Sequence, residues 1–341
     1  MKRLGHAEIG LALGVLAAVA IAVAAIWQPA ATAQAWLAAW LFWIGLPVGA
    51  LFVILAHGMV GGPWGIALRP TLHDLAATLP LLSLFLIPIL FGGGLVYPWA
   101  HAGGTGWLAP PFVALRAVVY VAAWGAIALA ARRRPGADGR LSGALAWPCL
   151  IVLFGTTSLA AFDWIMSLEP HWTSTIYGML VTTGWALAGL SAAILIAIAR
   201  GAADDPARLD TLARLLLALA ILWAYLSAVQ LIVLWESDLG HEIPWLLRRG
   251  GAWGQVAVVF TVFEFVLPFL LLLWRPVRRS PFAVALVALS ILAAHLIEIW
   301  WLAVPDFPVP FGWTEPVAVV AIGGCLIFMI ARVAPRVEPV R

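Results

Sequence analysis

The sequence predicts an all-α, polytopic membrane protein with ten transmembrane helices. Three observations predict this class: the composition, the recurrence of long apolar runs and the distribution of basic residues. Of the 341 residues, 64% are hydrophobic and only 10% are charged, whereas an ordinary soluble domain carries about 25% charged residues. So few charges cannot cover the surface of a soluble protein, which excludes cytosolic enzymes and nucleic-acid-binding proteins.

Ten apolar runs are long enough to cross the roughly 30 Å of hydrocarbon in a bilayer as helices. Helix is the expected state because lipid cannot satisfy an open backbone. The expected spans are 8–27, 35–56, 73–96, 111–131, 141–162, 174–199, 209–235, 253–274, 281–301 and 315–332.

The first span has a second interpretation, as a cleaved signal peptide. Lys2 and Arg3 precede it, and Ala31-Thr32-Ala33 resembles a signal-peptidase site. Its apolar stretch is longer than the roughly 7–15 residues of a signal peptide, so we expect a retained helix.

Basic residues fix the expected orientation. Of the 19 Lys and Arg residues, 16 fall on one side of the ten spans, only Arg248 and Arg249 fall on the other, and Arg116 lies inside a span. Because cytoplasmic loops are enriched in Lys and Arg, both termini are predicted to be cytoplasmic. The 16 are Lys2, Arg3, Arg69, Arg132, Arg133, Arg134, Arg140, Arg200, Arg208, Arg214, Arg275, Arg278, Arg279, Arg332, Arg336 and Arg341.

The chain offers little to hold a cofactor. Cys149 and Cys325 lie in apolar runs without a CxxC or CxxCH pattern, so we expect no c-type haem, iron–sulfur cluster or metal. The longest outer segments are only about 97–110 and 236–252. Any redox domain would therefore belong to another chain.

The single membrane domain, 1–341, divides into two units of four helices with the same orientation. Residues 35–162 form the first and 174–301 the second. The last helix of each unit ends in a carboxylate and tryptophan, as Asp163-Trp164 and as Glu298-Ile-Trp300. Internal duplication and chance both explain this weak similarity.

Ionisable residues inside apolar spans are costly and tend to be functional or paired. Glu264 lies in the middle of span eight, and Pro268 removes the amide that would bond its carbonyl. His295 and Glu298 share one helix face at i, i+3. A His–Glu pair can take up and release protons or hydrogen-bond a quinol; the alternative is a structural pair of hydrogen-bonded groups.

Further candidates lie nearer the span ends. Arg116 is expected to pair with Asp163 or Glu298, or to extend to the interface. His57, His73 and Asp74 lie at the cytoplasmic side, where they could take up protons; Asp74 could instead cap a helix. Several titratable residues lie on the outer side, where they are either solvated or contact a partner protein: Glu169, His171, Glu236, Asp238, His241 and Glu242.

Several stretches resemble one family of membrane proteins. They include His57-Gly-Met-Val-Gly-Gly-Pro-Trp64-Gly and Leu95-Val-Tyr-Pro-Trp99-Ala. The most specific is Phe162-Asp-Trp-Ile-Met-Ser-Leu-Glu-Pro-His-Trp172, and His295-Leu-Ile-Glu298-Ile-Trp-Trp301 also fits. They resemble the ActF-type (NrfD/PsrC-like) membrane subunit of alternative complex III, a bacterial quinol:cytochrome c oxidoreductase, over residues 36–332.

The resemblance implies two four-helix bundles with two flanking helices in the bacterial cytoplasmic membrane. It implies three partners: a multihaem cytochrome c subunit, an iron–sulfur protein subunit and a sister NrfD-like subunit that holds the main quinol site. This type of subunit contributes scaffold and a proton path. Asp163, His295 and Glu298 match motif positions, whereas the text around Gly58 and Val60 and at 235–242 departs from the pattern.

The sequence therefore predicts a cofactor-free subunit of a quinol-oxidising complex. The expected proton path runs from His57, His73 and Asp74 through Glu264 to His295, Glu298 and Asp163. Three alternatives stay open: a quinone bound by this chain at Arg116, Asp163, His295 and Glu298; a secondary transporter with a midplane site at Glu264; and a purely structural anchor.

Overall fold

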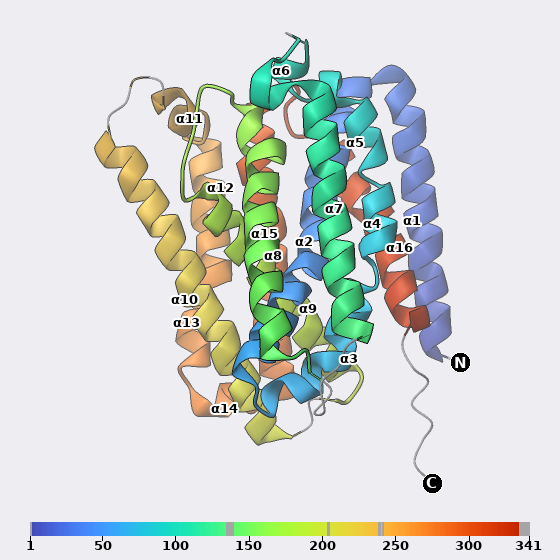
Figure 1. Cartoon of the computed structure of the whole chain (residues 1–341), viewed down its shortest axis with the longest axis vertical. Coiled ribbons are helices and arrows are strands. Elements are labelled where there is room, and N and C mark those ends of the chain that lie inside the picture. The colour runs from blue at the N-terminus through green and yellow to red at the C-terminus, as the bar shows by residue number, and fades with distance from the viewer. Residues whose placement is uncertain are drawn as a thin grey trace.

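The computed structural model describes residues 2–101, 103–133, 140–202, 205–237, 240 and 242–333, and over these residues it is helical without strands. Ten helical segments are long and apolar enough to cross a membrane. The expected all-α, polytopic class with ten spanning helices is confirmed. Figure 1 shows these helices side by side, with α1 beginning and α16 ending at the same end of the molecule.

Seven spans are formed by one principal helix each. They are α1 (Lys2–Trp27), α2 (Pro29–Val60), α7 (Pro110–Arg133), α9 (Tyr177–Ala199), α10 (Pro206–Ser237), α15 (Pro281–Ala303) and α16 (Thr314–Val333). The fifth span along the chain consists of α8 (Gly143–Trp164) followed by the short helix η3 (Met166–Leu168). Short helices connect the spans: η1 (Gly93–Leu95), α6 (Pro98–His101), η2 (Gly106–Leu108), α11 (Ile243–Arg248), α14 (Arg275–Arg278) and η5 (Val304–Asp306).

The third span differs from its expected bounds. It starts at Trp64 rather than residue 73, and it is divided into α3 (Trp64–Ala76), α4 (Leu79–Leu84) and α5 (Ile87–Phe91). Pro80 and Pro88 stand in the first turns of α4 and α5, where a missing amide is tolerated but the preceding helix is interrupted. Arg69 and Pro70 interrupt the apolar run in the sequence, and the predicted start of the span was therefore too late. His73 and Asp74 lie within the span rather than at its first turn.

The eighth span is interrupted differently. Helix α12 (Ala252–Thr261) passes into a π-helical turn, η4 (Val262–Val266), and then into α13 (Leu267–Leu272). The Leu267 amide donates to the Val262 carbonyl, five residues back. A π turn of this kind is rare and is frequent at functional sites.

Helices α2 and α9 form the centre of the molecule. Most residues of both are buried, and the two backbones approach closely. A Cβ at Gly189 would lie 2.6 Å from the Ala50 nitrogen, and one at Gly49 would clash with the Trp185 carbonyl. Small residues permit such close packing between membrane helices. Around this pair lie α3, α4, α7 and α8 against α2, and α10 and α15 against α9.

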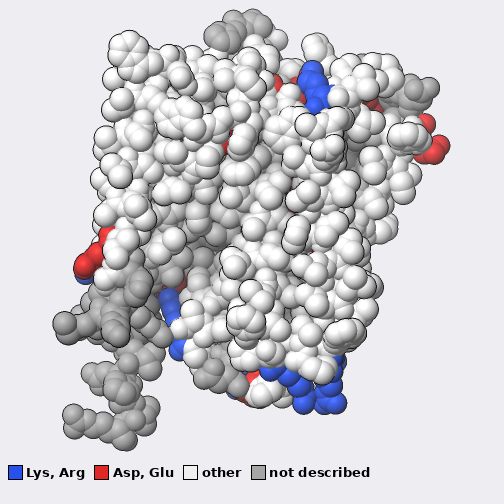
Figure 2. Space-filling model, turned by 180° about the vertical axis from the view of Figure 1, so that it is seen from behind, with Lys and Arg blue, Asp and Glu red and all other residues white. Residues whose placement is uncertain are grey.

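The outside of the molecule is apolar. Leu16 on α1, Phe91 on α5 and Ile151 on α8 are each more than 60% exposed, and α1 packs mainly against α16. Figure 2 shows a broad middle zone almost free of charged side chains, with Lys and Arg gathered at the lower end. This surface is typical of a multi-pass membrane protein. The side of the membrane on which the termini lie, and the grouping into two bundles, stay predictions.

Candidate functional site

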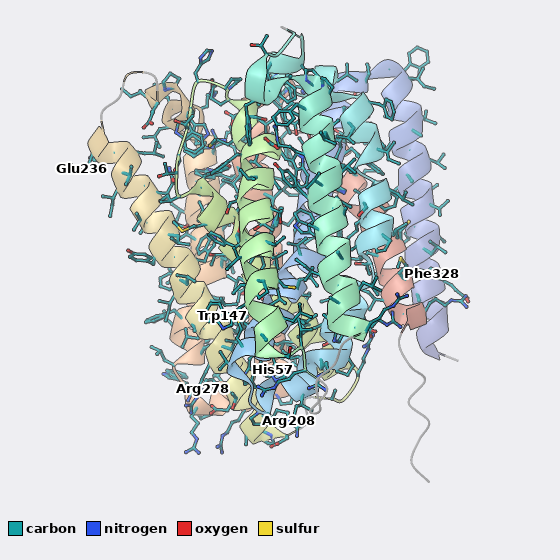
Figure 3. The ribbon with its side chains drawn as sticks, in the orientation of Figure 1. His57, Trp147, Arg208, Glu236, Arg278 and Phe328 are labelled. Carbon is teal, nitrogen blue, oxygen red and sulfur yellow. The ribbon has the colours of Figure 1, made fainter. Side chains whose placement is uncertain are left out.

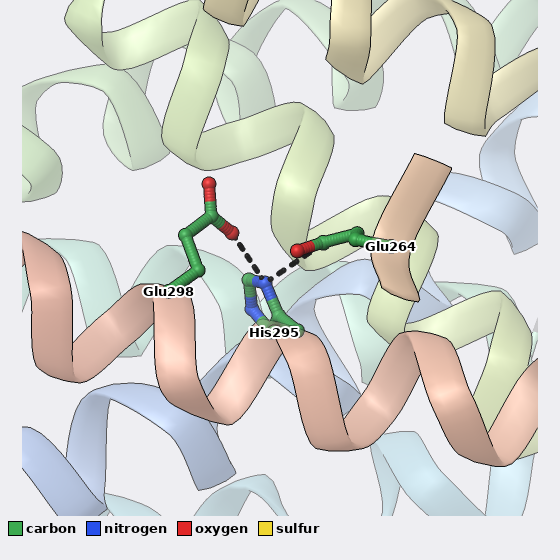
Figure 4. Close-up of side chains that lie close together, drawn as sticks. All are labelled: Glu264, His295 and Glu298. Carbon is green, nitrogen blue, oxygen red and sulfur yellow. Dashed lines mark hydrogen bonds and ion pairs between the residues drawn. The ribbon is translucent and has the colours of Figure 1, made fainter. Parts of the chain in front are cut away.

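Three titratable side chains that the sequence singled out meet inside the membrane-spanning part. Glu264, His295 and Glu298 are 0%, 1% and 4% exposed, and we call them the buried triad. The Nδ1 atom of His295 lies 2.8 Å from Glu298 Oε2 and 3.5 Å from Glu264 Oε1 (Figure 4). One imidazole nitrogen thus connects two carboxyl groups from different helices.

The local sequence explains how each member is placed. His295 and Glu298 share one face of α15 because i and i+3 residues are neighbours on a helix. Glu264 is buried in the π turn η4. Pro268 has no amide to bond the Glu264 carbonyl, and the wider turn adjusts the backbone at the level of the acid. The predicted opening of the helix is therefore a π turn.

Two further residues complete the surroundings of the buried triad. Trp223 on α10 donates its indole N–H to Glu298 Oε1 at 2.8 Å. Gly184 on α9 leaves room for the triad, since a Cβ there would lie 3.0 Å from His295 Cε1 and 3.4 Å from Glu298 Oε2. Sequence reasoning did not single out either residue. A tryptophan and a glycine in apolar helices carry no signal of their own until the tertiary contacts are known.

The buried triad is suited to proton transfer. Its three side chains can bind and release protons while each stays in place, and the imidazole can accept at one nitrogen and donate from the other. Glu264 Oε2 and His295 Nε2 have no hydrogen-bond partner among the described residues. Both atoms are therefore free to exchange a proton with a group or water that approaches them.

The same three residues could hold a metal ion, since one ligand atom from each lies within 4.8 Å of the others. Two carboxylates and an imidazole suit a transition metal by their chemistry. The distances favour hydrogen bonding, however, because ligands at about 2.0 Å from a tetrahedral zinc are about 3.3 Å apart. The close His295–Glu298 contact would also have to break.

Asp163 belongs to a second group, at the outer end of α8. Arg116 donates to both of its carboxylate oxygens at 2.7 Å. The Trp107 indole and the Tyr120 hydroxyl each donate at 2.9 Å. The predicted pairing of Arg116 with Asp163 is confirmed. Four donated hydrogen bonds thus reach a fully buried carboxylate, and charge-assisted bonds of this kind hold the group in one geometry.

Tyr97 lies near the negative charge of the Asp163 carboxylate. Its hydroxyl donates to the Trp164 carbonyl at 3.1 Å and is buried outside the spans. Burial, together with the nearby Asp163 carboxylate, raises the pKa of Tyr97 well above its usual value. Tyr97 is therefore a fixed donor rather than part of a proton path.

A comparable pair lies at the outer end of α15. Arg249 Nη2 donates to Asp306 at 2.6 Å and to the Leu302 carbonyl at 2.7 Å. Its guanidinium lies 3.8 Å from the centre of the Trp245 ring, much as Arg116 lies 4.0 Å from that of Trp107. The outer ends of α8 and α15 are thus each followed by or end in an Arg–Asp pair that lies against a tryptophan. The carboxylate near the end of α15 is Asp306, whereas the comparison of sequences matched Glu298.

His57, one of the residues predicted to lie on the cytoplasmic side, lies towards the opposite end of the molecule from Glu236 (Figure 3). His57 Nε2 lies 3.0 Å from the Gly62 carbonyl and therefore acts as its donor. A cavity of about 10 Å³, lined by His57, His73, Arg69 and Arg140, separates the two histidines. This is about the volume needed for one water molecule.

Asp74 does not cap a helix, because it lies in the last turns of α3. Its carboxylate instead forms a 2.6 Å ion pair with Arg200, and Arg200 also donates to the Ile330 carbonyl on α16. Through Arg200, this ion pair connects α3, the end of α9 and α16.

The residues proposed to bind a quinone fall into two bonded groups. Arg116 and Asp163 form one group, while His295 and Glu298 belong to the buried triad. An apolar groove of about 420 Å³ lies along the end of α1, lined by Val23, Trp27 and Trp313 among others. It includes none of the four.

Among the outer titratable residues that the structure describes, Glu169 is paired and two others are exposed. Glu169 pairs with Arg248, and Arg248 also bonds Asp306. His171 and Glu236 are exposed. Outside the described residues lie Asp238, His241, Arg134, Arg336 and Arg341, as do the side chains of Lys2 and Arg3.

Comparison with known proteins adds no further identification. No protein-family model matches this chain, and the search of curated proteins finds no match.

Proposed function

We propose that this chain is an integral membrane subunit of a quinol-oxidising respiratory complex of the alternative complex III type, and that it carries protons through the buried triad. The resemblance over residues 36–332 supports the complex. The proposed partners are a multihaem cytochrome c subunit, an iron–sulfur protein subunit and a sister NrfD-like membrane subunit. The chain itself binds no cofactor and lies in the bacterial cytoplasmic membrane with both termini cytoplasmic.

The buried triad is the observation that supports proton transfer. Titratable groups inside a bilayer cost at least about 2.5–3.5 kcal/mol each on insertion scales and mark proton relays and ion pathways when they occur together. Glu264, His295 and Glu298 are in mutual contact and almost fully buried. A structural role alone would be served equally well by an apolar packing of the same volume.

In this mechanism protons are taken up at His57 and His73, on either side of the water-sized cavity. They reach Glu264 in the π turn, pass to His295 and leave through Glu298. Because Nδ1 of His295 faces both carboxyl groups, the proton that this nitrogen takes from Glu264 is the same one that it passes to Glu298. Asp163, expected at the end of this path, forms a buried ion pair with Arg116.

The proposal is tested by isolating the tagged full-length chain from its native membranes in mild detergent. Mass spectrometry and haem staining would identify the proteins that accompany it. We expect a multihaem cytochrome, an iron–sulfur protein and a larger sister subunit. A chain that purifies alone, and that moves a solute into vesicles without partners, would instead establish a secondary transporter with the buried triad as its coupling site.

A further inference from the structure

We infer that the polar face of α10 and the irregular segment 169–176 form a water-accessible passage between the buried triad and the outer end of the molecule. Its use by protons rests on the proposed function. The passage itself is inferred from side chains and backbone that the proposed function does not otherwise explain.

Polar residues recur on one face of α10. Trp223, Ser227 and Gln230 are spaced i, i+4 and i+7, so they lie within about 60° of one another around the helix. From Trp223 to Gln230 the helix rises by about 10 Å towards its outer end. The opposite face of this part of α10 exposes Tyr225 and Ile232.

This face connects the buried triad to segment 169–176. At its inner end, Trp223 donates to Glu298 Oε1 at 2.8 Å. At its outer end, the Gln230 carboxamide oxygen accepts from Ser174 Oγ at 2.5 Å. Between these contacts, Ser227 Oγ and Gln230 Nε2 are buried and have no hydrogen-bond partner among the described residues. Because a buried polar atom without a partner is costly, water is the expected partner of both.

The backbone of segment 169–176 also points to water. Figure 1 shows that the chain between α8 and α9 runs inward from the outer end before α9 begins at Tyr177, well below the top of α8. Non-helical backbone at membrane depth occurs only where it is buried in protein or lines a water-filled cavity. The segment is held in place by the Glu169–Arg248 ion pair and by stacking of Trp172 on Trp245 at 4.1 Å.

The depth of the buried triad agrees with an outer passage. His295 lies about 12 Å from the outer end of α15 and about 21 Å from its cytoplasmic end. Asp163, the other carboxylate expected on the outer side, is held by four donated hydrogen bonds. The α10 face is therefore the short connection from Glu298 to the outer end.

Cysteine accessibility in native membranes tests the passage. Since the chain has only Cys149 and Cys325, their replacement by alanine gives a background without thiols. Ser174→Cys, Ser227→Cys and Gln230→Cys are then each treated with a membrane-impermeant methanethiosulfonate, applied to one side at a time. Tyr225→Cys, on the lipid-facing side of the same helix, is the matched control.

We expect all three passage variants to react from the outer side, about tenfold or more faster than Tyr225→Cys, because only a hydrated thiol ionises readily. The small Ser227→Cys change keeps the test valid if Gln230→Cys fails to fold. Rates equal to that of Tyr225→Cys, or reaction only from the cytoplasmic side, would overturn the passage. Fast outer labelling together with unchanged proton release in Glu264→Gln would establish the passage and refute the proton path instead.

Discussion

Replacing Arg116 with Met is expected to destabilise the protein by about 3–5 kcal/mol, because the Asp163 carboxylate would remain buried without its cation. The structure sets this magnitude: Arg116 donates to both oxygens at 2.7 Å, and Asp163 has no exposed surface. Trp107 and Tyr120 would still donate one hydrogen bond each. These two bonds offset only part of the loss, since neither carries a positive charge.

Thermal unfolding of the purified chain in detergent measures this effect. At about 2 °C per kcal/mol for a chain of this size, the midpoint should fall by roughly 6–10 °C. The control is Arg214→Met, at an ion pair whose Arg214 side chain is 63% exposed, where we expect less than about 1 kcal/mol.

The double variant Arg116→Met/Asp163→Leu sharpens the test. Removing both partners leaves no unpaired charge, so it should be more stable than Arg116→Met alone. A double variant that loses the sum of two single effects, or an Arg116→Met variant as stable as the Arg214→Met control, would refute the reasoning.

Two further predictions concern packing and the buried triad. Gly49→Ala should lower the free energy of unfolding by about 1–3 kcal/mol in the same thermal assay, because its Cβ would meet the backbone of α9. The control Gly125→Ala has open space around it and should be unchanged or slightly more stable. Equal unfolding midpoints for the two variants would contradict this account of the α2–α9 contact. Trp223→Phe should lose about 1–3 kcal/mol, because one Glu298 oxygen loses its donor in a buried site. Trp147→Phe, at a 59% exposed tryptophan, should have no effect, and a Trp223→Phe variant that unfolds at the same temperature as Trp147→Phe would show that the indole bond is unimportant.

Much of the fold follows from the sequence because a bilayer imposes a simple rule. Any apolar run of about 20 residues must satisfy its own backbone, and helix is the state that does so. This physical rule accounts for the correct count of ten spans. It fails at Trp64, where Arg69 and Pro70 interrupt the apolar pattern although the helix continues past them. A search for apolar runs does not detect a part of a helix whose polar residues face the protein interior.

The candidate site was partly predictable for a related reason. Glu264, His295 and Glu298 stand out because titratable groups are rare inside apolar spans, and the structure places their side chains in contact. Which acid pairs with which base depends on tertiary packing. Arg249 and Asp306 were therefore missed as a pair, whereas Arg116 and Asp163 were found. The i, i+4, i+7 pattern of Trp223, Ser227 and Gln230 is a signal that a search for polar helix faces would have found.

The number of protons released per quinol oxidised tests the central claim most directly. It is measured in sealed vesicles that contain the isolated complex, for the unsubstituted chain, for Glu264→Gln and for the control Glu315→Gln, another buried carboxyl group outside the triad. A relay through Glu264 predicts that Glu264→Gln still oxidises quinol but releases fewer protons per quinol, while Glu315→Gln matches the unsubstituted complex. An unchanged ratio in Glu264→Gln would contradict the relay.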